Sequence, residues 1–467
     1  MFLRNAPIVK KSILGSPLYM VLLLVVMLSG VDISYSQNWL WAKSAAGDNK
    51  DKSYSVATDG SGNVYVTGDY PSSSITFGAY TLTNLGTGNG FLVKYDASGN
   101  VLWAQNIGGP GDALGTGIAI DGSGNIYVSG CFGQPTITVG TFTLTNTNTF
   151  GYYDIFLAKY DPSGTVLWAK SAGGATGEQA TAVAVDALGN AYITGEFGDF
   201  MSTATITFGT ITLTASNSGS HDVFLAKYDP SGNVLWATNA GGGVWDQATS
   251  VAADVSGNAY ITGYFSSPTI PFGAFTLTNA GSGQNVFLVK YDPTGTVLWA
   301  QSAGGIAYDG GSSLADDPAG NVYLTGGFSS PTITFGATTL TSAGSADVFL
   351  TKYDPSGAVL WAQNAGGNFD DGGGGVAVNG TASVYLTGGF TSPSITFGTY
   401  TLTNSGVSSM FIAKYDTGGI VLCASSLQDG GLYAHVATDA SDDAYISAYF
   451  ENGPFPVGAT TLTLVPP

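Results

Sequence analysis

Apolar and polar positions alternate along most of the chain in short runs, and the same runs return in the same order. The phrase "LWA" or its variant "LCA" recurs at spacings of 62, 65, 68, 63, 62 and 62 residues, ending at Ala42, Ala104, Ala169, Ala237, Ala300, Ala362 and Ala424. Each copy is followed by a Gly-rich segment and by runs such as "AVAVD", "GNAYITG", "ITFG", "TLT" and "VFLAKYD". These runs are bounded by Gly, Asn, Asp or Pro and are rich in Val, Ile, Thr, Tyr and Phe, which predicts strands.

Four principal strands in each unit, with seven units, predict an all-β fold: a seven-bladed β-propeller built from repeats of about 62 residues. The small apolar runs "SVAT", "GIAI" and "AVAV" suit an innermost strand that is crowded around the axis. The bulky Trp of "LWA" suits an outer strand that packs against the neighbouring blade. A β-helix remains an alternative, and so does a row of sandwich domains, although sixty residues without a linker are few for an independent domain.

The count of the repeated runs locates the closure of the ring. "LWA" or its variant occurs seven times, whereas the "KYD" strand occurs six times. The repeats open with an outer strand at residues 39–44, which we expect to close the ring beside the last blade. One strand is then missing between them. Either residues 461–465 fill this place or the seventh blade is incomplete.

The first thirty-six residues have the pattern of a signal peptide. Arg4, Lys10 and Lys11 precede an apolar core at residues 18–28, and the small residues Ser34 and Ser36 precede Gln37. The apolar core is short for a membrane span, and no comparable segment follows it. We therefore expect residues 37–467 to be the propeller of an exported protein without an integral membrane segment, secreted or at the cell surface, with the periplasm as the alternative.

Charge and cysteine content narrow the class of partner. Residues 37–467 contain ten lysines, no arginine and thirty-one acidic residues, a net charge of −21. Such a chain repels phosphate backbones, so we expect no nucleic-acid partner. The two cysteines, Cys131 and Cys423, occupy different positions in the repeat, which excludes a scaffold held together by disulfides.

The combined pattern "GNVLWA…AGG…D…VAVD…GN.Y.TG.F…ITFG..TLT…AG..DVFLAKYD" resembles the bacterial β-propeller repeat family known as SBBP. The resemblance covers essentially residues 37–467. It implies a secreted or surface-exposed propeller, often of the Bacteroidetes type, and it implies no defined activity.

The repeated aspartate of "KYDPSG" predicts a turn. Asp161, Pro162, Ser163 and Gly164 follow the preferred order of a type I turn, in which the carboxylate accepts backbone hydrogen bonds. A calcium loop needs several alternating oxygen ligands, and none follows here. The "DxxGN" pieces, such as residues 186–190, are interpreted as turns for the same reason.

The Gly-rich loops carry the candidate binding residues. The fifth position before the first Val, Ile or Leu of the inner strand is acidic in five of seven units: Asp51, Glu178, Asp246, Asp309 and Asp371. In a propeller these carboxylates would ring one mouth of the central channel and could hold a cation such as calcium or attract a cationic group. The alternative, which we favour, is that each carboxylate accepts hydrogen bonds from its own loop.

No residue pattern predicts catalysis. The repeated lysines, such as Lys159 and Lys227, are interpreted as partners of nearby carboxylates. His221 and His435 have no second ligand at metal spacing, and no G-x-S-x-G motif is present. We therefore expect no catalytic residue, no bound metal and no cofactor apart from the calcium left open above. The sequence favours a monomeric, non-catalytic scaffold that binds protein or polysaccharide, with a carbohydrate hydrolase or lyase as the alternative.

Overall fold

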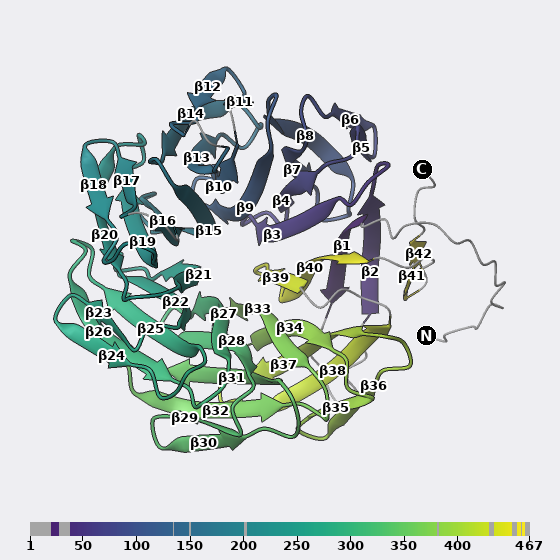
Figure 1. Cartoon of the computed structure of the whole chain (residues 1–467). Helices are drawn as coiled ribbons and strands as arrows, with labels where there is room; N and C mark the ends of the chain where they lie inside the picture. The colour runs from purple at the N-terminus through teal and green to yellow at the C-terminus, as the bar shows by residue number, and fades with distance from the viewer. Residues whose placement is uncertain are drawn as a thin grey trace.

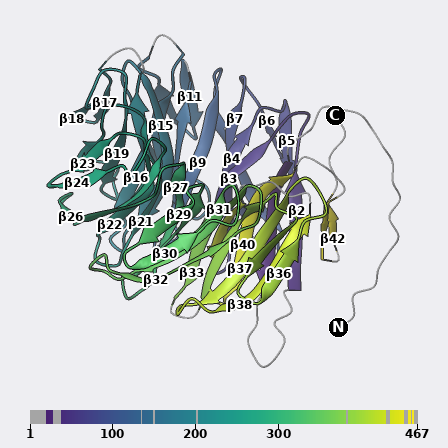
Figure 2. The ribbon, with the colours of Figure 1, turned by 60° about the horizontal axis from the view of Figure 1, so that its bottom comes forward.

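The computed structural model describes residues 20–27, 38–133, 135–148, 151–199, 203–380, 383–428, 434–450, 455–458 and 460–462. All regular elements in these ranges are β-strands. Antiparallel sheets stand around a common centre (Figure 1), and the view turned by 60° shows them side by side (Figure 2). The predicted all-β, propeller-like architecture is confirmed. None of the described residues forms a helix, so none forms a helix that could cross a membrane.

Each principal sheet has an inner strand that pairs antiparallel with a second strand. The inner strands are β3 (Lys52–Thr58), β9 (Ala113–Ile120), β15 (Gly177–Val185), β21 (Asp246–Ala253), β27 (Asp309–Asp316), β33 (Asp371–Asn379) and β39 (Ala434–Thr438). The second strands are β4 (Val64–Tyr70), β10 (Ile126–Phe132), β16 (Ala191–Gly198), β22 (Ala259–Phe265), β28 (Val322–Phe328), β34 (Ser383–Phe390) and β40 (Asp443–Phe450).

A third and a fourth strand complete each sheet toward the outside. The third strands are β7 (Asn89–Tyr95), β13 (Asp154–Tyr160), β19 (His221–Tyr228), β25 (Asn285–Tyr291), β31 (Asp347–Tyr353), β37 (Ser409–Asp416) and β1 (Met20–Met27). The fourth strands are β8 (Val101–Gly108), β14 (Val166–Ala172), β20 (Val234–Ala240), β26 (Val297–Ala303), β32 (Val359–Ala365), β38 (Val421–Gln428) and β2 (Asn38–Ala45).

The "ITFG..TLT" segments form small hairpins between the second and third strands. Their strands are β5 (Ser74–Phe77) with β6 (Tyr80–Thr83), β11 (Thr136–Val139) with β12 (Phe142–Thr145), β17 (Thr205–Phe208) with β18 (Ile211–Thr214), β23 (Thr269–Phe272) with β24 (Phe275–Thr278), β29 (Thr332–Phe335) with β30 (Thr338–Thr341), β35 (Ser394–Phe397) with β36 (Tyr400–Thr403), and β41 (Phe455–Val457) with β42 (Thr460–Leu462). One apolar side of each hairpin strand is buried, as the alternation in "ITF" requires.

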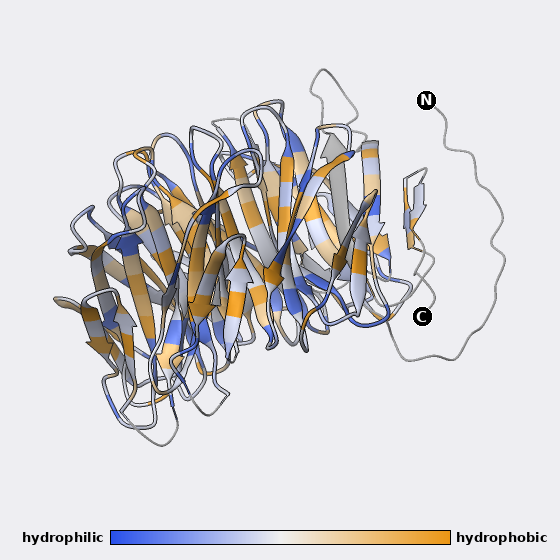
Figure 3. Cartoon of the chain, turned by 90° about the horizontal axis from the view of Figure 1, so that it is seen from above, coloured by the Kyte–Doolittle hydropathy of each residue, from blue (hydrophilic) through white to orange (hydrophobic). Residues whose placement is uncertain are grey.

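The hydrophobic core is divided among the spaces between neighbouring sheets. One cluster joins Tyr192 and Leu225 of one sheet to Ile261 and Phe287 of the next. Hydrophobic positions accordingly run along strands throughout the molecule (Figure 3). Because each sheet is buried on both sides, the second and third strands are almost continuously apolar.

Trp168 shows how a Trp of "LWA" contacts the neighbouring sheet, as the sequence predicts, whereas Cys423 takes this position in the sixth sheet. Trp168 of β14 donates its indole N–H to the Pro230 carbonyl in the turn between β19 and β20, at 3.0 Å. Gly232 in that turn has φ 81°, and a Cβ there would lie 2.9 Å from the Trp168 ring. Both the backbone conformation and the close approach therefore require glycine.

The seventh sheet differs from the sequence-based expectation. Its order is β2-β1-β40-β39, so β1 occupies the place of the missing strand. The prediction that residues 461–465 fill it is wrong for the part described, because Thr461 and Leu462 belong to β42 and pair with β41. Strand β1 lies inside the apolar core of the expected signal peptide. Removal of residues 1–36 stays a prediction.

Candidate functional site

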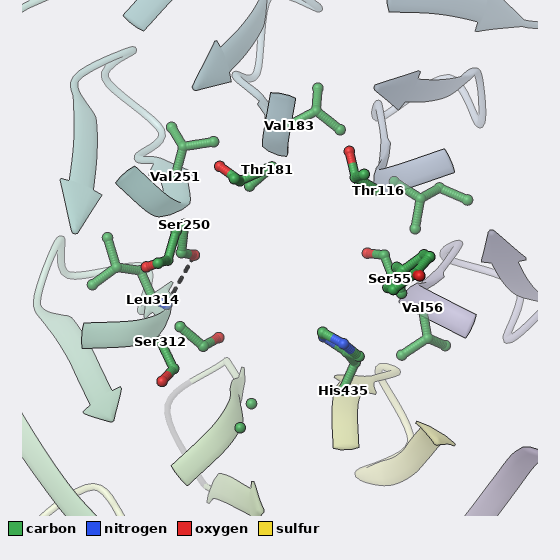
Figure 4. Close-up of a pocket in the computed structure, with 18 of the residues that line it drawn as sticks. Ser55, Val56, Thr116, Thr181, Val183, Ser250, Val251, Ser312, Leu314 and His435 are labelled. Atoms are coloured by element: carbon green, nitrogen blue, oxygen red, sulfur yellow. Dashed lines mark hydrogen bonds between the residues drawn. The ribbon is translucent and has the colours of Figure 1, made fainter. Parts of the chain in front are cut away.

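The inner strands line a cavity of about 180 Å³ at the centre of the molecule (Figure 4). Its wall carries small side chains and hydroxyls, including Ser55, Thr116, Thr181, Ser250 and Ser312. Many of these hydroxyls hold neighbouring inner strands together: Thr181 donates to the Ala248 carbonyl and Thr249 to the Gly311 carbonyl, each at 2.8 Å. Both threonines stand at a β-bulge, where the extra residue re-aims its side chain.

His435 projects into this cavity from β39 (Figure 4). It pairs with Ser447 at the register where the other inner strands carry Ser, Gly or Ala. Burial lowers the pKa of its imidazole to about 4, so the ring is neutral at pH 7. Within the described ranges no three His, Cys, Asp or Glu side chains gather as metal ligands would. A neutral imidazole in a hydroxyl-lined cavity can donate and accept a hydrogen bond but has no paired acid or base.

The five carboxylates proposed from sequence lie at the starts of the inner strands and are buried. Asp246 accepts hydrogen bonds from the Gly242 N–H at 2.8 Å, the Ser267 N–H at 3.1 Å and the Ser267 hydroxyl at 2.8 Å. Asp309 and Asp371 make the same contacts in the next two sheets. This geometry is the loop-capping alternative stated above. Ligand binding by the five carboxylates stays a prediction.

Asp51 and Glu178 depart slightly from that pattern. Asp51 accepts from the Gly47 N–H at 2.6 Å and the Ser72 N–H at 3.3 Å. Glu178 accepts from the Thr176 hydroxyl at 3.2 Å. Burial raises the pKa of Asp51 and Asp246 to about 6 and that of Glu178 to about 9. Because the charged form is penalised, Glu178 is protonated in the folded protein at neutral pH.

The turns at the end of the sheets opposite the Gly-rich loops are stabilised by their aspartates, as predicted. Asp161 accepts from the N–H groups of Ser163 and Thr165, each at 2.9 Å, and Gly164 has φ 88°. Asp186 accepts from Leu188 and Asn190 in the same way. The aspartate of "KYDPSG" is a turn residue.

The repeated lysines pair with these turns. Lys227 Nζ lies 3.4 Å from Asp186, 4.7 Å from the centroid of the Tyr192 ring and 3.3 Å from the Pro293 carbonyl of the next sheet. Equivalent contacts surround Lys94, Lys159, Lys290 and Lys352. The prediction that the lysines are carboxylate partners is confirmed, and the same contacts join neighbouring sheets.

The sixth sheet achieves this contact with different residues. Asn379 stands where the other inner-strand turns carry aspartate, and Lys414 instead contacts Asp442 of the seventh sheet at 2.6 Å. Asp442 takes the place of a glycine and keeps its positive φ of 68°, while its own carbonyl still accepts from the Tyr385 hydroxyl at 2.8 Å. The substitution of Asp for Gly at position 442 therefore supplies the carboxylate that Asn379 lacks.

The end of each sheet nearest the Gly-rich loops carries a cross-strand pair that changes from sheet to sheet. In the first four sheets both members of the pair carry side chains: Lys52–Asp69, Leu114–Cys131, Gln179–Glu196 and Gln247–Tyr264. In the next two the pairs are glycines: Gly310–Gly327 and Gly372–Gly389. We call the first four pairs the filled half of the mouth and the two glycine pairs the glycine half.

The glycine half is hollow. A cavity of about 480 Å³ is lined by both glycine pairs, by Tyr264 and Asp370, and by Thr249, Ser312 and His435, which it shares with the central cavity. A Cβ added at Gly372 would meet nothing within 4 Å, so the space above this glycine is open. The hollow therefore adjoins the central cavity.

Large apolar side chains are exposed on the loops that precede the inner strands of the fourth, fifth and sixth sheets. Trp245 is 40% exposed, Tyr308 68% and Phe369 55%, each next to or near a capping aspartate. We call these three residues the aromatic rim. Exposed aromatic side chains beside a concave, mostly pre-formed site are typical of a binding surface.

The filled half contains a buried carboxyl group, Glu196, that contacts two aromatic rings. Glu196 accepts a hydrogen bond from the Trp245 indole, and its Oε2 lies 3.7 Å from His221 Nδ1. The His221 ring stacks on Trp245 with centroids 5.0 Å apart. Burial raises the pKa of Glu196 to about 7 and lowers that of His221.

Neither the aromatic rim nor the glycine half was found by reasoning from the sequence. Repeated positions predicted the candidate residues, whereas both of these features lie at positions that vary between repeats. Gly327 and Gly389 occupy the variable position of "TGxF", and the aromatic rim lies at the variable end of the Gly-rich loop. The signal was present as the series Asp, Cys, Glu, Tyr, Gly and Gly at residues 69, 131, 196, 264, 327 and 389.

Comparisons with known proteins agree with this architecture. Residues 42–69 and 102–130 match the family described as SBBP, beta-propeller repeat. An uncharacterized WD repeat-containing protein of Acanthamoeba polyphaga mimivirus is 26% identical over 89% of this chain and 36% of its own length. The regulatory protein FlaEY of Caulobacter vibrioides is 25% identical over 62% of this chain and 32% of its own length. The chain thus spans about a third of these relatives.

Two solved structures share the topology only weakly. Sqt1 from Chaetomium thermophilum covers 86% of this chain and 97% of its own at 11% identity and a TM-score of 0.41. A puromycin hydrolase complexed with PGG covers 79% of this chain and 53% of its own at 12% identity and a TM-score of 0.33. The two matched segments each lie within one repeat, and the strand pairing shows the same antiparallel four-stranded arrangement recurring from sheet to sheet.

Proposed function

We propose that the chain is a seven-bladed propeller, with its N-terminal outer strand β2 in the last blade, that is exported and acts as a non-catalytic scaffold for a protein partner. Support for the closed ring comes from hydrogen bonds that join the last inner strand to both of its neighbours, the first and the sixth inner strands. The Thr58 hydroxyl donates to the Thr438 carbonyl at 2.7 Å, and the Thr438 hydroxyl donates to the Val378 carbonyl at 3.2 Å.

The observation that carries the proposal is the hollow glycine half, in the two sheets whose inner strands follow the exposed Tyr308 and Phe369. Repeated residues hold the sheets together and make the sheets alike. A ligand site that lies on one side of the molecule needs residues that differ between sheets. The break here is a cavity large enough for one or two side chains of a partner, and the exposed residue Asp370 is part of its lining. Tyr308 and Phe369 are exposed on the loops that precede the inner strands of the same two sheets. With a net charge of −21, residues 37–467 favour a partner segment that carries Lys or Arg beside an apolar group.

The test is a binding screen of the exported protein against purified surface proteins and a glycan panel. The matched variant carries Gly310→Gln and Gly372→Gln, which copy the glutamines of the filled half. The control variant carries Gly122→Gln, because a Cβ at Gly122 also meets nothing within 4 Å. We expect a protein ligand that the control retains and the filled variant loses. Binding only to glycans, or binding that survives filling, would contradict the proposal.

Glu196 favours one second candidate, a secreted enzyme that acts on carbohydrate. A carboxyl group with a pKa of about 7 can serve as a general acid. Turnover of a glycan that is lost in Glu196→Gln but kept in Glu178→Gln would favour this enzyme over the scaffold.

A further inference from the structure

The place of β1 in the seventh sheet is the place that the "KYD" strands take in the other six. Strand β1 pairs with β40 on one side and with β2 on the other. Among the described residues, β1 is the only strand that pairs with β2. If β1 is removed, β40 and β2 each present one row of unpaired backbone groups. The two rows face each other across a slot that is one strand wide.

The registers show which residue type this slot accepts. In the other sheets a lysine of the third strand stands between a tyrosine and the residue of the "LWA" position, as in the row Tyr192, Lys227 and Trp236. In the seventh sheet the same row is Tyr445, Val25 and Trp41. The irregularity that follows each lysine also follows Val25. Val25 therefore occupies the register of the lysine.

The contacts that receive a lysine elsewhere are also present around this row. Asp439 accepts a hydrogen bond from the Tyr445 hydroxyl at 2.9 Å, as Asp59 does from Tyr65. The Ala97 carbonyl accepts from the Trp41 indole at 2.9 Å, as the Pro230 carbonyl accepts from Trp168 and also from Lys159. No ion pair of Asp439 with a lysine occurs in the part of the chain that the structure describes.

The residues beside the slot suit an apolar strand. Ile446, Ala448 and Phe450 of β40 are buried in one cluster with Met410 and Ile412 of the neighbouring sheet. Tyr445 packs with Trp41 and Tyr95 on the other side. A strand that contains Phe-Leu and ends in Lys-Tyr would place apolar side chains on both faces of the sheet. The third strands of the other six sheets do the same.

We propose that the exported chain, once cleaved before Gln37, binds in this slot an extended segment of another polypeptide with the pattern Asp-Val-Phe-Leu-x-Lys-Tyr. The segment adds the third strand by backbone pairing, and its lysine enters the site formed by Asp439, Tyr445 and the Ala97 carbonyl. The inference rests on the export that is part of the proposed function, but not on the glycine half. Strand β1 holds the place until cleavage.

The test uses the exported protein, with its N-terminus read by mass spectrometry. The probe is a labelled peptide of sequence DVFLTKYD, which copies residues 347–354, and the control peptide carries Lys352→Val. We expect one peptide per chain and a higher melting temperature. Either the control peptide or Asp439→Asn in the chain should weaken binding about tenfold, and combining them should add little. Gly372→Gln should leave peptide affinity unchanged, which separates this slot from the glycine half.

A second measurement in the full chain covers the case in which the cleaved protein fails to fold. Asp439→Asn should lower the melting temperature more in a Val25→Lys chain than in the unaltered chain. Equal binding of both peptides, no binding, an exported protein that retains β1, or dimers formed by exchange between copies would each overturn the inference. Equal effects of Asp439→Asn in the two full chains would overturn it as well.

Discussion

The two ends of each sheet differ in how strictly they repeat. At the turn end, an aspartate, a tyrosine and a lysine recur from sheet to sheet with nearly the same contacts, and where Asn379 breaks the series Asp442 restores it. At the mouth, the cross-strand pair changes in almost every sheet and becomes glycine in two. Residues that repeat hold neighbouring sheets together. Positions that vary between sheets are where a ligand can be recognised.

The largest expected effect comes from breaking the turn end. Lys227→Met leaves the buried Asp186 carboxylate without its cation and removes the contact to the Pro293 carbonyl. Loss of one partner of a buried pair should lower the free energy of unfolding by about 3 kcal/mol, measured by urea denaturation. Lys170→Met, at an exposed lysine, is the control and should change stability little.

The restored network of the sixth sheet predicts a rescue. Asp442→Gly removes the carboxylate beside Lys414 and should cost about 2 kcal/mol. Adding Asn379→Asp rebuilds the arrangement of the other sheets and should recover most of the loss. If the double variant is no more stable than Asp442→Gly alone, Asp442 is not a replacement for the missing aspartate.

The pH dependence distinguishes the carboxylates of the two ends. The pKa of Glu178 at the mouth end is raised to about 9, so the folded state holds this proton while the unfolded state releases it above about pH 4.5. Glu178 therefore weakens the fold as the pH rises. Asp161 at the turn end has a lowered pKa, so its contribution is present above its unfolded pKa and is lost as the pH falls through the folded value.

The corresponding measurement is thermal denaturation of Glu178→Gln against the unaltered chain. The variant should become progressively more stable relative to the unaltered chain between about pH 5 and pH 8, because its amide does not titrate. A stability difference that is constant across this range would mean that Glu178 is ionised in the folded protein.

Reasoning from sequence located the strands, the turns and the lysine pairs because each of these appears six or seven times. It did not place β1, because an apolar run of that length suits a signal peptide and a buried strand equally well. It missed the glycine half because a single glycine in one copy of the repeat carries no signal until strand register sets Gly310 opposite Gly327 and Gly372 opposite Gly389.

The smallest expected effect on stability is that of Gly372→Gln, the variant that tests binding at the glycine half. Gly372→Gln places a side chain in open space and should change the free energy of unfolding by less than about 0.5 kcal/mol. Gln179→Gly empties the equivalent position of the filled half and should cost about 1 kcal/mol, because glycine weakens a strand.

The most direct measurement is therefore the affinity of the protein ligand for these two variants, side by side with the unaltered chain. We expect Gly372→Gln to abolish binding while it leaves the fold intact, and Gln179→Gly to leave the affinity unchanged while it lowers stability. Equal affinity of Gly372→Gln and the unaltered chain would contradict the assignment of the glycine half as the binding site.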